Sequence, residues 1–173
     1  MLANVNAPEQ CALSGPTAAV EQIRQRLQAD GHTVHALPVS AAFHSPLMQP
    51  ARAPFTAFLS DQIAISAPAL PVHANLDGAP YPLEPEQIRS RWVAHLENCV
   101  DFVAQVEQMY AAGVRTFVEI GPGRVLTGLV QRILHDRPHR AVAFDGATRT
   151  AQGGLTSWLA ALAELYTGGQ SLN

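Results

Sequence analysis

A histidine stands where a predicted strand gives way to a predicted helix. His44 lies in the segment Ser40-Ala41-Ala42-Phe43-His44-Ser45-Pro46, and catalytic groups of α/β folds often occupy such strand ends. An imidazole there could act as a general base near neutral pH. The structural alternative is a histidine that is hydrogen-bonded at a helix start, beside the Ser45 cap. Position alone favours this alternative.

A general base in nucleophilic catalysis needs a nucleophile, and these 173 residues do not visibly supply one. They contain no Gly-x-Ser-x-Gly elbow. Ser14 precedes a glycine, but Ala12 stands where the first glycine would be, and a helix cap explains Ser14 better. Cys11 and Cys99 lie in no nucleophile-like context.

Two other groups of residues are of types that could bind a phosphate or a metal ion. Gly121-Pro122-Gly123-Arg124 falls between a predicted strand and a predicted helix, where a phosphate could bind. Its glycine spacing fits neither a P-loop nor a dinucleotide fingerprint, so a tight turn demanded by packing is the favoured interpretation. The histidine pairs have no metal-ligand pattern, because no carboxylate or cysteine accompanies His32 and His35, and Pro138 interrupts the helix that would align His135 with His139. We expect no metal site.

Strands and helices alternate in the predicted order that positions these residues, so the fold class is α/β. The apolar periodicity, glycines and prolines predict strands over 11–13, 33–39, 69–73, 116–120 and 141–144, and helices starting at Pro16, Ser45, Pro85, Asp101 and Val125, with a last one through 155–165. Pro50 and Pro54 predict that the second helix is kinked or divided into two pieces. Asp77-Gly78 predicts a turn.

The composition excludes several classes of protein. With 47% hydrophobic residues and a net charge of −3, the chain is neither disordered nor an acidic tail, and no apolar run reaches the length of a membrane span. All eleven basic residues are arginines and they do not cluster, so nucleic acid is not expected as a partner. Two cysteines form no framework and Met1-Leu2-Ala3-Asn4 does not open a signal peptide, so we expect a reducing, cytoplasmic location. Only 14% of residues are charged, which is sparse for a domain that must cover its whole surface.

Four motifs in order give the chain a family resemblance. It resembles the acyltransferase domain of type I polyketide and fatty acid synthases and its relation, the bacterial malonyl-CoA:acyl carrier protein transacylase. The motifs that carry the resemblance are Asn4–Gln10 with Leu13-Ser14-Gly15, Ala41–Met48, Trp92–Leu96 with Val100-Asp101-Phe102, and Phe117–Leu126 with its Gly-Pro-Gly.

The resemblance implies a fold and a missing partner half. It implies the C-terminal part of an α/β-hydrolase-like large subdomain over 40–145, part of a ferredoxin-like small subdomain over 1–39, and a terminal helix with the following linker over 146–173. In this family a serine of a Gly-His-Ser-x-Gly elbow attacks acyl-CoA, and a downstream arginine holds the carboxylate of malonyl-type substrates. Both would precede this chain, so we expect a fragment that is inactive by itself.

The resemblance also assigns roles to four residues. His44 would be the general base for the absent serine, and the backbone carbonyl of His95 would orient it, a role that needs no particular side chain. Ala41-Ala42-Phe43-His44 is nearer the malonyl-type His-Ala-Phe-His form than the methylmalonyl-type Tyr-Ala-Ser-His form, and Phe43 would crowd an α-methyl branch. Ala41 departs from the malonyl form. By the same resemblance, Asn6 would lie near the site that binds the acyl group.

The implied function is transfer of a malonyl or other short acyl group from CoA to the phosphopantetheine of an acyl carrier protein, with no bound cofactor. The alternative is a non-catalytic docking module of a polyketide or fatty acid synthase that keeps the acyltransferase outline. A third hypothesis is that a separate N-terminal chain completes the site. The low content of charged residues agrees with a missing half of the domain, because faces that pack against that half should be apolar. We therefore expect this chain by itself to expose an apolar patch.

Overall fold

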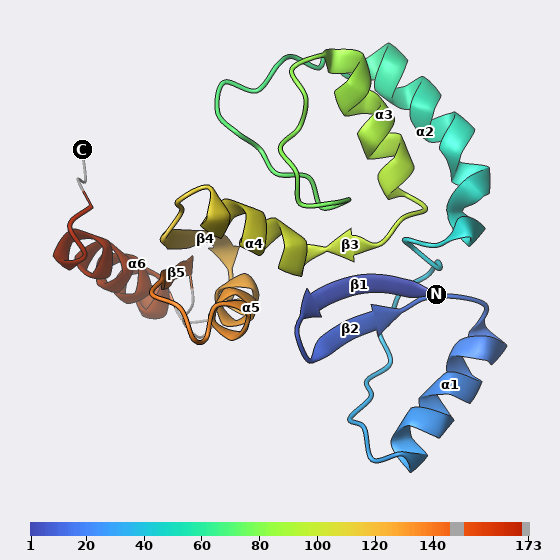
Figure 1. The fold of residues 1–173 in the computed structure, drawn as a ribbon, viewed down its shortest axis with the longest axis horizontal. Coiled ribbons are helices and arrows are strands. Elements are labelled where there is room, and N and C mark those ends of the chain that lie inside the picture. The colour runs from blue at the N-terminus through green and yellow to red at the C-terminus, as the bar shows by residue number, and fades with distance from the viewer. Residues whose placement is uncertain (146–150, 171–173) are drawn as a thin grey trace. The chain divides into compact units, whose positions relative to one another are not determined.

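The computed structural model describes residues 1–145 and 151–170. They form two compact units, residues 1–105 and 106–173, in which helices and small sheets confirm the α/β class (Figure 1). The first unit contains β1 (Leu2–Ala7), β2 (Gln10–Leu13), α1 (Thr17–Ala29), α2 (Gln49–Gln62), α3 (Pro85–His95), β3 (Val100–Asp101) and the start of α4 (Phe102–Ala111). The second contains the rest of α4, β4 (Thr116–Pro122), α5 (Val125–Ile133), β5 (Arg140–Asp145) and α6 (Ala151–Thr167).

The sheet of the first unit has the strand order β2-β1-β3. β1 and β2 form an antiparallel hairpin in which Val5 pairs with Cys11. β3 runs parallel to β1 and pairs Val100 with Asn4. The sequence predicted β2 and missed the other two strands, because asparagines interrupt the apolar pattern of β1 and β3 is only two residues long.

Helix α1 begins one residue later than predicted. Pro16 has φ −56° and ψ 137°, which is extended rather than helical, so it is the N-cap and not the first helical residue. Its carbonyl accepts the first helical hydrogen bond, from the Val20 N–H. None of the residues of α1 is buried, and Ile23 on its apolar side is exposed.

Two predicted strands are absent, which corrects the sequence interpretation. Residues 33–39 form no strand, since no described strand lies beside them to accept and donate hydrogen bonds. Leu37 in this segment is 64% exposed. Residues 69–73 contribute only an isolated bridge between His73 and Pro80. Alternating or apolar residues favour extended backbone, but a strand also needs a hydrogen-bonding neighbour.

The predicted kink or division at Pro50 and Pro54 is wrong: α2 is one helix from Gln49 to Gln62, with Pro50 in its first turn, where no helical hydrogen bond is lost, and Pro54 inside it. A short 3-10 helix, Pro46–Met48, leads into α2, which continues through Pro54. Helix α2 lies beside α3 (Figure 1). Arg52 on α2 forms an ion pair of 3.4 Å with Glu97, which follows α3.

A turn preceding α3 connects that helix to the start of α4. At Asp77-Gly78 the predicted turn is confirmed: Gly78 has φ +72° and its N–H donates to the Ala74 carbonyl. Asp77 forms an ion pair with Arg91 on α3. The Gln105 side chain on α4 donates to the His73 carbonyl at 2.8 Å. The turn thereby fixes the position of α3.

In the second unit, β4 and β5 form a two-stranded parallel sheet. Helix α6 packs on β5, where Val142, Ala161 and Leu165 form a buried cluster with Phe144 against it. Ile120 on β4 is 83% exposed. Parallel sheets are normally covered on both faces, so an apolar side chain this exposed is unusual on such a strand.

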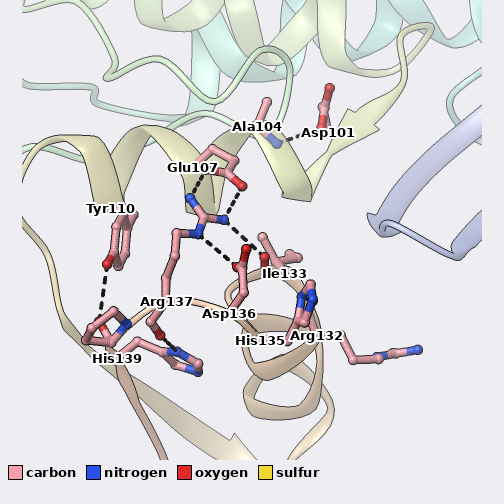
Figure 2. A network of polar contacts seen from close by, with 11 residues as sticks. Asp101, Ala104, Glu107, Tyr110, Arg132, Ile133, His135, Asp136, Arg137 and His139 are labelled. Atoms are coloured by element: carbon pink, nitrogen blue, oxygen red, sulfur yellow. Dashed lines mark hydrogen bonds and ion pairs between the residues drawn. The ribbon is translucent and has the colours of Figure 1, made fainter.

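An ionic network joins α4 to the connection between α5 and β5 (Figure 2). The Arg137 guanidinium donates two hydrogen bonds, of 2.7 and 2.6 Å, to the two carboxylate oxygens of Glu107. Arg115 and Arg137 both lie over the Tyr110 ring, at 3.7 and 4.9 Å from its centroid. The hydrogen bond from Arg137 holds the pKa of the Glu107 carboxyl below its usual range. We assign the network to packing of the second unit.

Candidate active site

His44 has a backbone conformation that is rare for a residue with a side chain. Its φ is +58°, and it is the one non-glycine residue with a positive φ among those the structure describes. The left-handed region costs such a residue roughly 1–2 kcal/mol, which surrounding contacts must offset. The hydrogen bonds of His44 therefore have to hold this conformation.

Two consecutive carbonyl groups at the C-terminal end of α3 hold His44 in place. The His44 N–H donates to the Leu96 carbonyl at 3.1 Å, and the ring atom Nδ1 lies 3.0 Å from the His95 carbonyl oxygen. Carbonyls at a helix C-terminus lack partners within the helix and carry its partial negative charge. They therefore fix both the backbone and the ring of His44.

The contact with His95 determines which ring nitrogen of His44 carries the proton. A carbonyl oxygen only accepts hydrogen bonds, so Nδ1 must be the donor. In the neutral ring Nε2 then carries a lone pair and can take a proton. Nε2 is thus the ring nitrogen of neutral His44 that can accept a hydrogen bond or a proton.

Ser45 fixes the turn that follows His44. Its side chain is buried, donates to the Ala42 carbonyl at 2.6 Å and accepts from the Leu47 N–H at 3.3 Å. Ser45 is the N-cap of the 3-10 helix, as the structural interpretation of the sequence predicted. The cap and the oriented ring occur together, so the two interpretations of His44 are compatible.

The His95 ring lies against the ring of His44. Their centroids are 4.8 Å apart with an interplanar angle of 38°. Burial, and then the nearby charge of His44, lower the pKa of the His95 imidazole. Both causes favour the uncharged form of the His95 ring.

The other two predicted site residues are not brought into hydrogen-bonding contact with this pair. Phe43 directly precedes His44 and is 45% exposed, so its ring is not committed to the core. Asn6 is half-buried on β1. In the described part of the chain, no hydrogen bond joins Asn6 to either histidine.

The Gly-Pro-Gly segment is the irregular end of β4, where the register shifts and Pro122 pairs with Asp145, followed by a bend before α5. Gly121 and Gly123 have φ values of +142° and +93°, and the Gly123 N–H donates to the Asp145 carbonyl at 2.8 Å. The N-terminus of the following helix α5 already has an anion from within the chain. The Glu119 carboxylate accepts from the Leu126 N–H at 3.2 Å and from the N–H and hydroxyl of Thr127, both at 2.7 Å.

Glu119 was missed at the sequence level, although it lies just before the glycine-rich segment. The carboxylate occupies the place that a phosphate would take, which supports the packing interpretation of this segment. Burial raises the pKa of the Glu119 carboxyl, but the hydrogen bonds from Thr127, Leu126 and Val125 together outweigh it and lower the pKa below its usual range.

Replacing Glu119 with glutamine is expected to destabilise the second unit by about 1–2 kcal/mol at pH 7, since it removes a charge-assisted helix cap. Because the folded-state pKa is lowered, the stabilisation is present above the unfolded pKa of roughly 4.3 and is lost as pH falls through the folded value. Urea unfolding of both proteins at pH 7 and pH 3 measures this. An equal difference at the two pH values would contradict the ionic cap.

No cluster of three or more histidine, cysteine, aspartate or glutamate side chains that could hold a metal ion occurs among residues 1–145 and 151–170. Over the same residues, no helix has the length and apolar character needed to cross a membrane. Cys11 and Cys99 are free.

The chain is thus an α/β protein in which a backbone carbonyl holds the ring of a histidine with positive φ. Residues 1–171 match the acyl transferase domain, and the chain belongs to this family. It is 37% identical over 163 residues to the polyketide biosynthesis protein ThaF of Burkholderia thailandensis, covering 94% of this chain and 14% of that protein.

Solved structures of the family extend the likeness to the fold. The acyltransferase domain from the second module of the salinomycin polyketide synthase superposes with a TM-score of 0.84 at 34% identity, covering 100% of this chain and 39% of that one. An acyl carrier protein S-malonyltransferase from Vibrio cholerae gives a TM-score of 0.78 at 31% identity, covering 95% and 49%. The chain thus spans half or less of these solved chains, which fits the expected partial domain.

Proposed function

We propose that this chain forms part of an acyltransferase that moves a malonyl or other short acyl group from CoA to an acyl carrier protein. The observation that carries the proposal is the 3.0 Å contact between His44 Nδ1 and the His95 carbonyl oxygen, which leaves Nε2 as the base. The nucleophilic serine would come from a part of the domain outside these 173 residues. We assign residues 1–39 and 40–145 to the small and large subdomains, and 146–173, which lie partly outside the described residues, to the terminal helix and linker.

The proposed reaction uses His44 twice. In the first half, Nε2 takes the serine proton while the serine oxygen attacks the thioester carbonyl, and the proton passes to the departing CoA thiolate. In the second half, Nε2 takes the proton of the carrier protein's pantetheine thiol, the sulfur attacks the seryl ester, and the proton returns to the serine oxygen. The His95 carbonyl stabilises the imidazolium that forms each time.

Phe43 is proposed to select the acyl group, and Asn6 to lie near it. Replacing Phe43 with serine in a complete acyltransferase domain should raise the methylmalonyl-to-malonyl ratio of kcat/KM by roughly tenfold, the usual effect of room for one carbon. Competition between the two CoA thioesters measures the ratio. An unchanged ratio would remove Phe43 from the specificity determinants.

The function is tested by completing the domain. We would replace the aligned part of the salinomycin acyltransferase domain with residues 1–170 and follow radiolabelled malonyl transfer from malonyl-CoA to an acyl carrier protein. We expect transfer by the folded chimaera and none by the isolated chain. A chimaera that is folded by circular dichroism but transfers no acyl group overturns the proposal. Malonyl-CoA turnover by the isolated chain that is lost on His44→Ala would show that the nucleophile is not outside it.

A further inference from the structure

The side chain of His95 has an environment that its backbone role does not require. It is the last residue of α3, and its ring packs against the His44 ring at 4.8 Å between centroids. Its Nε2 atom is buried and makes no hydrogen bond to any of the described residues. A buried ring nitrogen without a partner costs stability, so its retention beside the base calls for an explanation.

Two imidazoles this close do not both carry a charge easily. A positive charge on either ring opposes a positive charge on the other. Burial further disfavours a charge on His95 and lowers its pKa. The Nδ1 atom of His44 faces the carbonyl end of α3, where the helix carries its partial negative charge.

The charged side chains on the surrounding elements are engaged with one another. Arg52 on α2 pairs with Glu97, which follows His95 by two residues. On α3, Arg91 pairs with Asp77 and Arg89 pairs with Glu86. In the next element, Asp101 on β3 accepts from the Ala104 N–H at the start of α4.

We propose that the His95 imidazole is a positioning residue for His44, packing on its ring and remaining uncharged so that His44 alone holds the proton exchanged during catalysis. This inference rests on the proposed role of His44 as general base. It adds a function for the His95 side chain, whereas the proposed function uses only the His95 backbone carbonyl. The ring contact limits rotation of His44 about its side-chain bonds and keeps Nδ1 on the His95 carbonyl.

The test is a pH titration of the histidine ring signals of the whole chain by NMR, with ¹³C- and ¹⁵N-labelled histidine. In the wild type we expect His95 to titrate below the ordinary histidine value of about 6.5, and the His44 signals to show a second, smaller step at the same pH. His95→Gln should remove that second step, because the side chain stays polar and planar but no longer titrates. His32→Gln, a change of an exposed histidine, should leave it in place.

The reciprocal variant keeps the test decisive. His44→Gln removes the charge that opposes protonation of His95, so the midpoint of His95 should rise. If the midpoint of the His95 titration in His44→Gln equals that in the wild type, the inference is overturned. This result does not require that His95→Gln folds. Persistence of both steps in a folded His95→Gln overturns it as well. Because none of these readouts depends on acyl transfer, failure here is distinguishable from failure of the proposed function.

Discussion

Replacing His44 with alanine in the completed acyltransferase domain is expected to lower kcat for malonyl transfer by roughly 10³-fold. General acid–base catalysis by a positioned side chain contributes about 10²–10⁴, and His44 would supply it in both halves of the reaction. Its Nδ1 is fixed by the His95 carbonyl and its backbone by the Leu96 carbonyl. Among the described residues, no other side chain is hydrogen-bonded to the His95 carbonyl.

The two half-reactions separate this loss from a binding defect. CoA release in a single turnover reports acylation of the serine, and transfer from preloaded enzyme to the carrier protein reports deacylation. His44→Ala should slow both, with KM for malonyl-CoA nearly unchanged. His32→Ala, which alters an exposed histidine, is the matched control. Undiminished acylation in His44→Ala would assign the base to a residue elsewhere.

The sequence predicted most helices because a helix depends on nearby residues. Val125, Leu129 and Ile133 recur at helical spacing, and α5 buries Leu129 and Ile133 as expected. Strands depend on distant partners. Residues 33–39 have an apolar strand pattern but lie beside no described strand, whereas β1 has a weaker pattern and is paired on both edges.

The site was found by motif, but its geometry could not be predicted from local sequence. The carbonyl that orients His44 is 51 residues further along the chain, and contacts of this kind decide whether a histidine takes a positive φ. The ring of His95 was missed because the resemblance assigns a role only to its backbone. Glu119 was missed because its contact with the start of α5 depends on the positive φ of Gly121 and Gly123, which lie between Glu119 and that helix.

Gly78→Ala is expected to destabilise the first unit by about 2–5 kcal/mol. A Cβ atom at Gly78 would lie 2.6 Å from the carbonyl carbon of Ala104 and 2.7 Å from the backbone nitrogen of Gln105. These are backbone atoms of α4 that cannot rotate away, so the overpacking costs about 1–3 kcal/mol. The φ of +72° adds roughly 1–2 kcal/mol of conformational cost for a residue with a side chain.

Gly31→Ala separates the two costs, because Gly31 has a similar φ of +86° but a Cβ there meets no atom within 4 Å. It should cost only about 1–2 kcal/mol. Urea unfolding of the wild type and both variants measures the difference. The turn also holds Arg91 through Asp77, so Gly78→Ala should perturb the His44 ring signals at the far end of α3, and Gly31→Ala should not. Equal destabilisation by the two substitutions would show that α4 does not press on Gly78.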